Sequence, residues 1–96
     1  MKLLMIICPE ERRDDVMNLV ETHGVHSFTA LPSAIGEGVT GKHLGTHVWP
    51  GKVLLLFTVV RDEKKDELVA ALDECRRRLF PAEGMKVFVL PAEEAI

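Results

Sequence analysis

The sequence has no tyrosine, no glutamine and only two cysteines, Cys8 and Cys75. Two cysteines so far apart in the chain form neither a disulfide framework nor the close pair of a zinc or redox motif, so we expect free thiols in a cytoplasmic protein. Long hydrophobic runs are also missing. The longest, residues 3–7 and 53–60, fall well short of the roughly 20 residues that cross a membrane. We therefore expect no membrane insertion, and the first residues have no cleavage site typical of a signal peptide.

A concentrated positive charge is missing as well. The chain has 12 lysines and arginines against 15 acids, which gives a net charge of −3. The only dense basic run, Arg76-Arg77-Arg78, falls where a helix is expected to end, and cations there interact favourably with the helix dipole. Because no basic face remains, we expect no nucleic-acid partner. Hydrophobic residues make up 47% of the chain, which is enough for a folded core and too much for a disordered chain.

Residues suited to catalysis are few. Ser27 and Ser33 have no G-x-S-x-G context around them. Cys8 precedes an expected helix, whose amino end would lower a thiol pKa, but it also closes an apolar strand, so we favour a buried, unreactive thiol. The acidic residues gather near the beginnings of predicted helices, where exposure to water explains them. We therefore expect a binding protein with no catalytic turnover of its own, not an enzyme.

Apolar runs and helical spacing alternate along the chain. Residues 2–8 predict a strand that Pro9 stops, and Pro9 suits the first position of the helix that follows. Further strands are predicted at residues 25–31, 53–60 and 85–90, the first ended by Pro32 and the last by Pro91. Each predicted helix has one apolar face. The residues of these faces are Val16, Leu19, Val20 and His23 in the first helix and Leu68, Leu72, Cys75 and Leu79 in the second.

Capping residues set the expected limits of both helices. Gly24 is placed to end the first helix, Asp62 can cap the second, and Pro81 and Gly84 close it. The resulting order is strand, helix, strand, strand, helix, strand, which is typical of the ferredoxin-like βαββαβ fold. We predict an α+β sandwich that forms one domain over residues 1–96, with a four-stranded antiparallel sheet and both helices on one face.

The first and third predicted strands are apolar at nearly every position. Two helices cover one face of such a sheet, and a wet second face would produce alternating polar residues. The runs at residues 3–7 and 53–57 do not alternate, so both faces should be removed from water. The simplest cover for the second face is another copy of the same sheet, which predicts a homo-oligomer.

A long glycine-rich loop is expected at about residues 32–51, which holds five of the seven glycines. Such a connection is well above the usual 2–5 residues of a hairpin, and loops of this length are usually functional. Residues 36–41 match G-x-G-x-x-G, but no helix follows, so this is not a dinucleotide fingerprint. Its bare backbone could still approach phosphate groups through N–H donors.

The same loop contains His43, His47 and Trp49. Two histidines four residues apart lie on one side of a helical turn or a strand, and they could bind a divalent metal if copies around a symmetry axis supplied further ligands. Exposed histidines without a metal are the alternative. Trp49 suits an interface with a partner protein, because an indole offers a large contact area.

The two ends of the chain are similar to those of a known family. Residues 85–96, MKVFVLPAEEAI, resemble the closing strand of the PII signal-transduction (nitrogen regulatory) proteins, with its pattern G-K-I-F-V-x-P-V-E-x-A/V-I. Residues 1–9, MKLLMIICP, and 24–29, GVHSFT, also resemble that family. The resemblance implies a ferredoxin-like homotrimer that binds adenine nucleotide (AMP, ADP or ATP) between subunits. It also implies a long loop that engages a target protein, such as a transporter or an enzyme.

Several features depart from that family's pattern. PII proteins usually carry a loop tyrosine that is uridylylated and a loop glutamine that helps to hold Mg²⁺-ATP and 2-oxoglutarate, and this chain has neither residue. The usual turn T-G-x-x-G-D-G-K is replaced at residues 79–86 by LFPAEGMK, which places Glu83 where phosphate would lie. The resemblance therefore implies a divergent PII-like regulator that binds nucleotide weakly, with AMP or ADP competing well against ATP.

The positions that match the family's nucleotide cleft are Thr29, Gly36, Gly38, Val59, Gly84 and Lys86. They are the candidate nucleotide-binding residues, and Trp49 is the candidate partner-binding residue of the loop. The alternative function is a metal-responsive trimer similar to the divalent-ion tolerance proteins, which would use His43 and His47.

Overall fold

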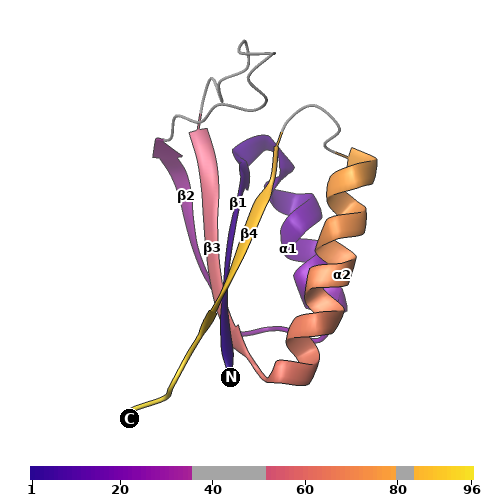
Figure 1. Ribbon diagram of the computed structural model, residues 1–96. Coiled ribbons are helices and arrows are strands. Elements are labelled where there is room, and N and C mark those ends of the chain that lie inside the picture. Colours follow the sequence, from indigo (N-terminus) through magenta and orange to yellow (C-terminus); the bar gives the residue numbers. More distant parts are fainter. Residues whose placement is uncertain (36–51, 80–83) are drawn as a thin grey trace, which may run out of the picture.

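The computed structural model describes residues 1–35, 52–79 and 84–96. Its elements follow the predicted order along the chain, with one short 3₁₀ turn before the first helix (Figure 1). They are β1 (Lys2–Pro9), η1 (Glu10–Arg12), α1 (Arg13–Thr22), β2 (Thr29–Ile35), β3 (Lys52–Val60), α2 (Asp62–Leu79) and β4 (Lys86–Pro91).

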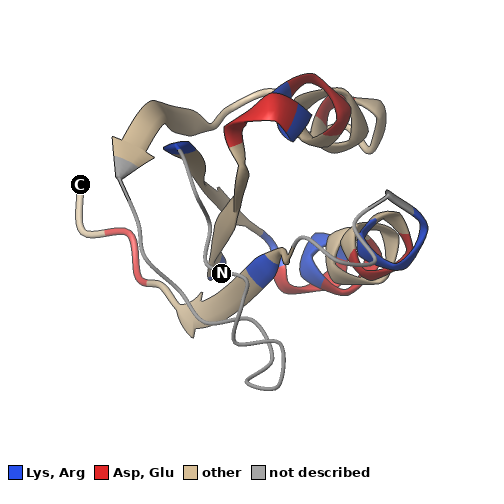
Figure 2. Cartoon of the chain, turned by 90° about the horizontal axis from the view of Figure 1, so that it is seen from above, with Lys and Arg blue, Asp and Glu red and all other residues tan. Residues whose placement is uncertain are grey.

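The four strands form one sheet in the order β2-β3-β1-β4, and every neighbouring pair is antiparallel. Both helices lie against the same face of the sheet, as Figures 1 and 2 show from two directions. The two most apolar strands, β1 and β3, occupy the centre, where each is paired on both sides. The predicted ferredoxin-like fold is confirmed.

The core lies between the sheet and the two helices. Alternate residues of the central strands point into it, and Leu4, Ile6, Leu54 and Leu56 are fully buried there. The helices contribute the facing side of the core through Val16 and Val20 of α1 and Leu68, Leu72 and Cys75 of α2. Full burial of an aliphatic side chain contributes about 1.5–3 kcal/mol to folding, so this layer supplies most of the stability of the fold. The predicted helix faces are confirmed at these positions.

The carboxyl end of α1 is closed by Gly24, as predicted. Gly24 has a φ of 83°, its N–H donates to Glu21 O at 2.9 Å, and the N–H of Val25 donates to Val20 O at 3.1 Å. This pair of bonds satisfies the last carbonyls of the helix in the Schellman arrangement, which a glycine adopts without strain. The C-cap residue His23 anchors the same end to the second helix.

Residues of α2 hold this end of α1 in place. His23 Nδ1 lies 2.6 Å from Glu67 Oε2, and Lys64 Nζ donates to His23 O at 2.8 Å. The hydrogen bonds from His23 and Lys64 lower the pKa of Glu67 below its usual value, because they favour the ionised carboxylate. The two helices are thus connected at one end by polar contacts and along their length by the core.

The prediction for the second strand is wrong at both of its ends. The strand begins at Thr29 and not at residue 25, and it continues through Pro32 to Ile35. A proline inside a strand is tolerated here because β2 is an edge strand, so the missing N–H is not needed by a neighbour. A register shift between Leu31 and Ala34 also accommodates it. Residues 32–35 of the expected loop therefore belong to β2.

The second helix spans Asp62–Leu79 and carries acids in its first turn and three arginines in its last. Asp62 is its first residue, and the Arg61 carbonyl accepts the first helical bond from Lys65 N at 3.0 Å. The Asp62 carboxylate, which was predicted to cap the helix, forms an ion pair with the amino terminus: its Oδ1 lies 3.3 Å from the nitrogen of Met1. In the part of the chain that the structure describes, no helix is long and apolar enough to cross a membrane.

Candidate functional site

The sheet face opposite the helices is apolar. We call it the open face, and the strand register gives its apolar members: Leu3, Met5, Ile7, Leu31, Leu55, Phe57, Val59, Phe88 and Leu90. Thr29 and Lys86 lie on the same face at its two edges. Met5 pairs with Phe57 on one side and with Phe88 on the other, so the apolar surface is continuous across three strands. Phe88 is 50% exposed and Leu31 48%. A contiguous exposed apolar surface of this kind is typical of an interface between proteins.

One end of the open face is hollowed beside β2 and β3. A cavity of about 270 Å³ is lined there by Leu3, Ser27, Phe28, Thr29, Phe57, Thr58 and Val59. It brings together two of the predicted nucleotide-binding residues, since Thr29 pairs with Phe57 and Val59 pairs with Leu3. The Thr58 hydroxyl donates to Ser27 O at 2.8 Å and fixes the chain before β2. The cavity therefore combines apolar walls with hydroxyl groups at its edge.

The other predicted nucleotide-binding residues lie elsewhere. Lys86 begins β4, pairs with Ile7 and is exposed, and Gly84 precedes it with a φ of 102°. Because β2 and β4 are opposite edges of the sheet, Thr29 and Lys86 are three strand spacings, or about 14 Å, apart across the sheet. Lys86 also lies two residues further along in the register. One copy of the chain does not bring these two groups of residues together.

The remaining candidates fall outside the described residues. Gly36, Gly38, His43, His47 and Trp49 all belong to the segment that the structure leaves undescribed. Within residues 1–35, 52–79 and 84–96, no three His, Cys, Asp or Glu side chains come close enough to hold a metal ion.

Cys8 lies in the core and not at a site. Its side chain is fully buried, as predicted, and Cys75 is 2% exposed, with both thiols free. Loss of contact with water, with a smaller effect from the nearby Cys75 thiol, raises the pKa of Cys8 from 9.0 to about 12. Burial also raises the pKa of Cys75. Desolvation thus outweighs any lowering of the Cys8 pKa by the nearby helix end. Because little thiolate forms, Cys8 is unsuited to nucleophilic catalysis.

We expect alkylation of Cys8 by iodoacetamide at pH 8 to be about a thousandfold slower than that of an ordinary thiol. A pKa of about 12 in place of 9.0 leaves roughly one thiolate in ten thousand at that pH. Mass spectrometry of the digested protein measures the reaction, and Asn18→Cys, an exposed position on α1, provides the matched fast thiol. Alkylation of Cys8 as fast as that of the introduced cysteine would contradict the buried, high-pKa state.

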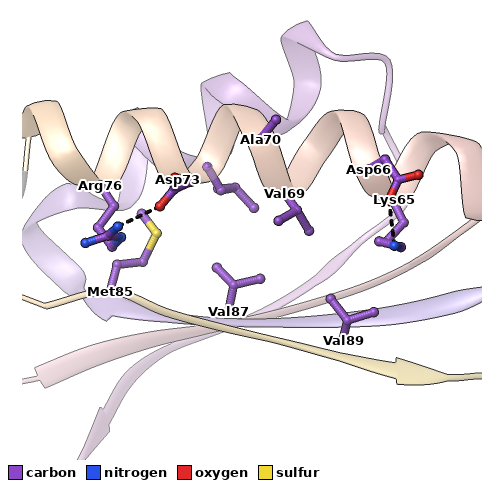
Figure 3. Close-up of a pocket in the computed structure, with 10 residues that line it drawn as sticks. Lys65, Asp66, Val69, Ala70, Asp73, Arg76, Met85, Val87 and Val89 are labelled. Carbon is purple, nitrogen blue, oxygen red and sulfur yellow. Dashed lines mark hydrogen bonds and ion pairs between the residues drawn. The ribbon is translucent and has the colours of Figure 1, made fainter.

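A second and larger cavity lies on the helix side, between α2 and β4. It has a volume of about 490 Å³ and aliphatic walls that include Val69 and Val87, and Val87 and Val89 point towards α2 in Figure 3. An ion pair stands near each end: Lys65 with Asp66, and Arg76 with Asp73, each at 2.6 Å. No pattern in the sequence indicates this groove, because Val69 and Ala70 lie just beside the core-facing side of α2. Its charged groups are paired with each other, so it presents no group poised for chemistry.

The family model for nitrogen regulatory protein P-II matches the chain over residues 1–96. The chain belongs to the P-II family. The match includes the segments at both ends that resemble PII proteins, so the predicted family is confirmed. No match was found among curated proteins.

Solved structures of PII-like proteins share the fold. CPII from Thiomonas intermedia K12, a nitrogen regulatory PII-like protein bound to ADP, AMP and bicarbonate, is similar with a TM-score of 0.70 and 21% identity, covering 99% of this chain and 94% of CPII. A PII-like signalling protein from Thermus thermophilus is similar with a TM-score of 0.63 and 25% identity, covering 93% of this chain and 83% of that one. Both structures share the fold of this chain.

Proposed function

We propose that this P-II family member is a regulator that binds an adenine nucleotide in the cavity beside β2 and transmits its occupancy to a partner protein. The observation that carries the proposal is the cavity itself, because Thr29 and Val59 line it together. It is supported by CPII, a structural neighbour bound to ADP and AMP. Signalling by nucleotide occupancy needs no catalytic group, and the buried Cys8 offers none.

The walls of the cavity suit an adenine ring. Leu3, Phe57 and Val59 provide apolar contact area for a flat base, and the exposed Thr29 supplies a hydroxyl that can donate or accept a hydrogen bond at its edge. Most ligand sites have this composition, with predominantly apolar walls and few polar groups that fix the orientation. The cavity is small, however, and holds the base better than a whole nucleotide.

The rest of the site is proposed to come from a neighbouring copy in a homotrimer. In one copy the sheet order keeps Gly84 and Lys86 on the opposite edge from Thr29. Packing of open faces against each other would bring the β4 edge of one copy next to the β2 edge of the next. Lys86 would then supply positive charge for the phosphates, and the left-handed backbone at Gly84 would allow their close approach.

The segment between β2 and β3 is the proposed output surface. It contains Gly36 and Gly38, candidates for nucleotide contact, and Trp49, the candidate anchor for a target transporter or enzyme. Along the chain, the nucleotide candidates follow the end of β2, and Trp49 precedes the beginning of β3. Nucleotide occupancy is therefore expected to bias partner binding through this segment.

We expect ADP and AMP to bind at least as tightly as ATP, and Thr29→Val to weaken ADP binding by about three- to tenfold. The substitution keeps the size of the side chain and removes one hydrogen-bonding group, and such a group contributes about 0.5–1.5 kcal/mol. Titration calorimetry measures the affinities. Thr22→Val, the same change at an exposed position on α1, is the control and should bind as the unmodified protein does.

Two results would contradict this assignment. Sub-micromolar affinity for Mg²⁺-ATP, with AMP unable to compete, would mean that the phosphate-binding elements are intact despite Glu83 in their usual place. Equal loss of affinity in Thr29→Val and Thr22→Val would mean that the cavity beside β2 does not contact the base.

A further inference from the structure

A buried hydroxyl lies next to the cavity beside β2. Thr58 of β3 is 3% exposed, and it is the only buried polar side chain in the described part of the chain. Its pairing with Leu4 places it on the helix side of the sheet, where Leu4 is fully buried. Valine has the same shape and no polar group to bury, so packing of the core alone does not require a threonine here.

The Thr58 hydroxyl has its partner outside the sheet. It donates to Ser27 O at 2.8 Å, which satisfies a group that is costly to bury without a partner. Ser27 belongs to residues 25–28, the connection between α1 and β2, which is neither helix nor strand. The hydrogen bond therefore ties this connection to β3.

Few polar contacts hold the middle of this connection. Val25 is buried in the core at one end, and Phe28 is half-buried and packs against the core. At the other end, Thr29 begins the pairing of β2 with β3. Among the described residues, no backbone–backbone hydrogen bond outside the regular elements involves residues 26–28. The side chain of Thr58 supplies the hydrogen bond that the backbone does not.

The same connection forms part of the cavity wall. Ser27, Phe28 and Thr29 line the cavity from the connection and the beginning of β2, and Phe57 and Val59 line it from β3. The width of the cavity depends on how closely the connection is held to β3. The hydrogen bond to the Ser27 carbonyl joins these two parts of the wall, so it sets that width.

We infer that Thr58 is a positioning residue for the proposed nucleotide site: its hydroxyl holds the connection before β2 against β3, so that the cavity is shaped for the base before the ligand binds. This inference rests on the proposed function. Thr58 acts through Ser27, because its own side chain lies on the helix side of the sheet. Without the bond, the ligand binds only the fraction of molecules in which the cavity is formed, which lowers the apparent affinity.

Thr58→Val removes the hydroxyl and keeps the shape of the side chain. We expect it to weaken ADP binding by about three- to tenfold, which is the change in population that the loss of one hydrogen bond produces. Thr58→Ala, a second variant without the hydroxyl, should bind at least as weakly, and Thr58→Ser, which keeps it, should bind within about twofold of the unmodified protein. Titration calorimetry measures the affinities. Thr22→Val, the same change at an exposed position on α1, is the matched control and should bind normally.

Two further measurements separate positioning from a loss of stability. The cavity is proposed to hold the base, which AMP, ADP and ATP share, so Thr58→Val should lower all three affinities by one common factor. Val16→Ala removes two buried methyl groups near the beginning of α1, whereas the connection follows the end of α1. It should lower the melting temperature and leave ADP affinity unchanged. The carbonyl ¹³C chemical shift of Ser27 should move in Thr58→Val and not in Val16→Ala.

The outcomes distinguish this inference from the function on which it rests. If the unmodified protein binds no adenine nucleotide, the proposed function is overturned, and the role of Thr58 in binding falls with it. If the unmodified protein binds ADP and Thr58→Val binds it equally well, the inference alone is overturned. A loss that Val16→Ala matches, a loss that Thr58→Ser shares, or a loss that differs between AMP and ATP by more than about twofold would also overturn it.

Discussion

Leu55→Glu is expected to convert the proposed trimer into a folded monomer. Leu55 lies near the middle of the open face, paired with Ile7 on one side and Leu31 on the other. A carboxylate there would be buried against the open face of a neighbouring copy without a partner, and an unpaired buried charge costs several kcal/mol. In a monomer the same carboxylate faces water, so the fold itself should survive.

Sedimentation velocity measures this change of mass, and far-UV circular dichroism checks that the monomer is folded. Ala70→Glu, an exposed position on the helix side, is the control and should leave the assembly unchanged. Two results would contradict the role of the open face: a stable monomer for the unmodified protein, or an intact trimer for Leu55→Glu.

Leu4→Glu should prevent folding altogether. Leu4 is fully buried on the opposite face of the sheet, between Thr58 of β3 and Val89 of β4 in the register. The change removes about 2–5 kcal/mol of apolar burial and packing and adds the cost of a buried carboxyl group. A domain of this size has a total stability of about 5–15 kcal/mol, so little or none would remain.

Thermal unfolding followed by circular dichroism tests the Leu4 prediction. The variant should lack the cooperative transition that the unmodified protein shows, and Leu4→Met, which conserves volume, should lower stability by less than about 1.5 kcal/mol. Lower pH should partly restore the fold, because a buried carboxyl group has a raised pKa and is less costly when it is protonated. A folded Leu4→Glu monomer would place Leu4 on the open face and contradict the observed register.

The faces on which Leu4 and Leu55 lie could not be predicted from the sequence. The unbroken apolar runs at residues 3–7 and 53–57 indicated two faces that avoid water, and the structure confirms two apolar faces. The runs did not tell which residues face the helices, because a continuous run carries no alternation from which to read the phase. The pairing of β1 with β3 decides which residues face the helices, and it places Leu4 and Leu55 on opposite faces of the sheet.

The end of β2 was mispredicted for a related reason. Proline is a local signal against a strand, so the predicted strand ends at Pro32. Whether a missing N–H matters depends on whether a neighbour needs it, and β2 has a neighbour on one side only. The positive φ of Ser33 and its bond to Glu10 join residues that are distant in the chain, so no local pattern indicates them.

Local physical preferences determined the order of the elements and the fold class of this protein. Apolar spacing and capping residues indicated the order of the elements and the fold class, because both depend on neighbours within a few residues along the chain. The resemblance of the segments at both ends to PII proteins indicated the family. The tertiary structure alone decided that the candidate nucleotide-binding residues fall into two separate groups. It placed Thr29 and Val59 in one cavity and put Lys86 on the far edge of the sheet. Strand order and register are set by contacts between distant segments, and those contacts leave no periodic trace in the sequence.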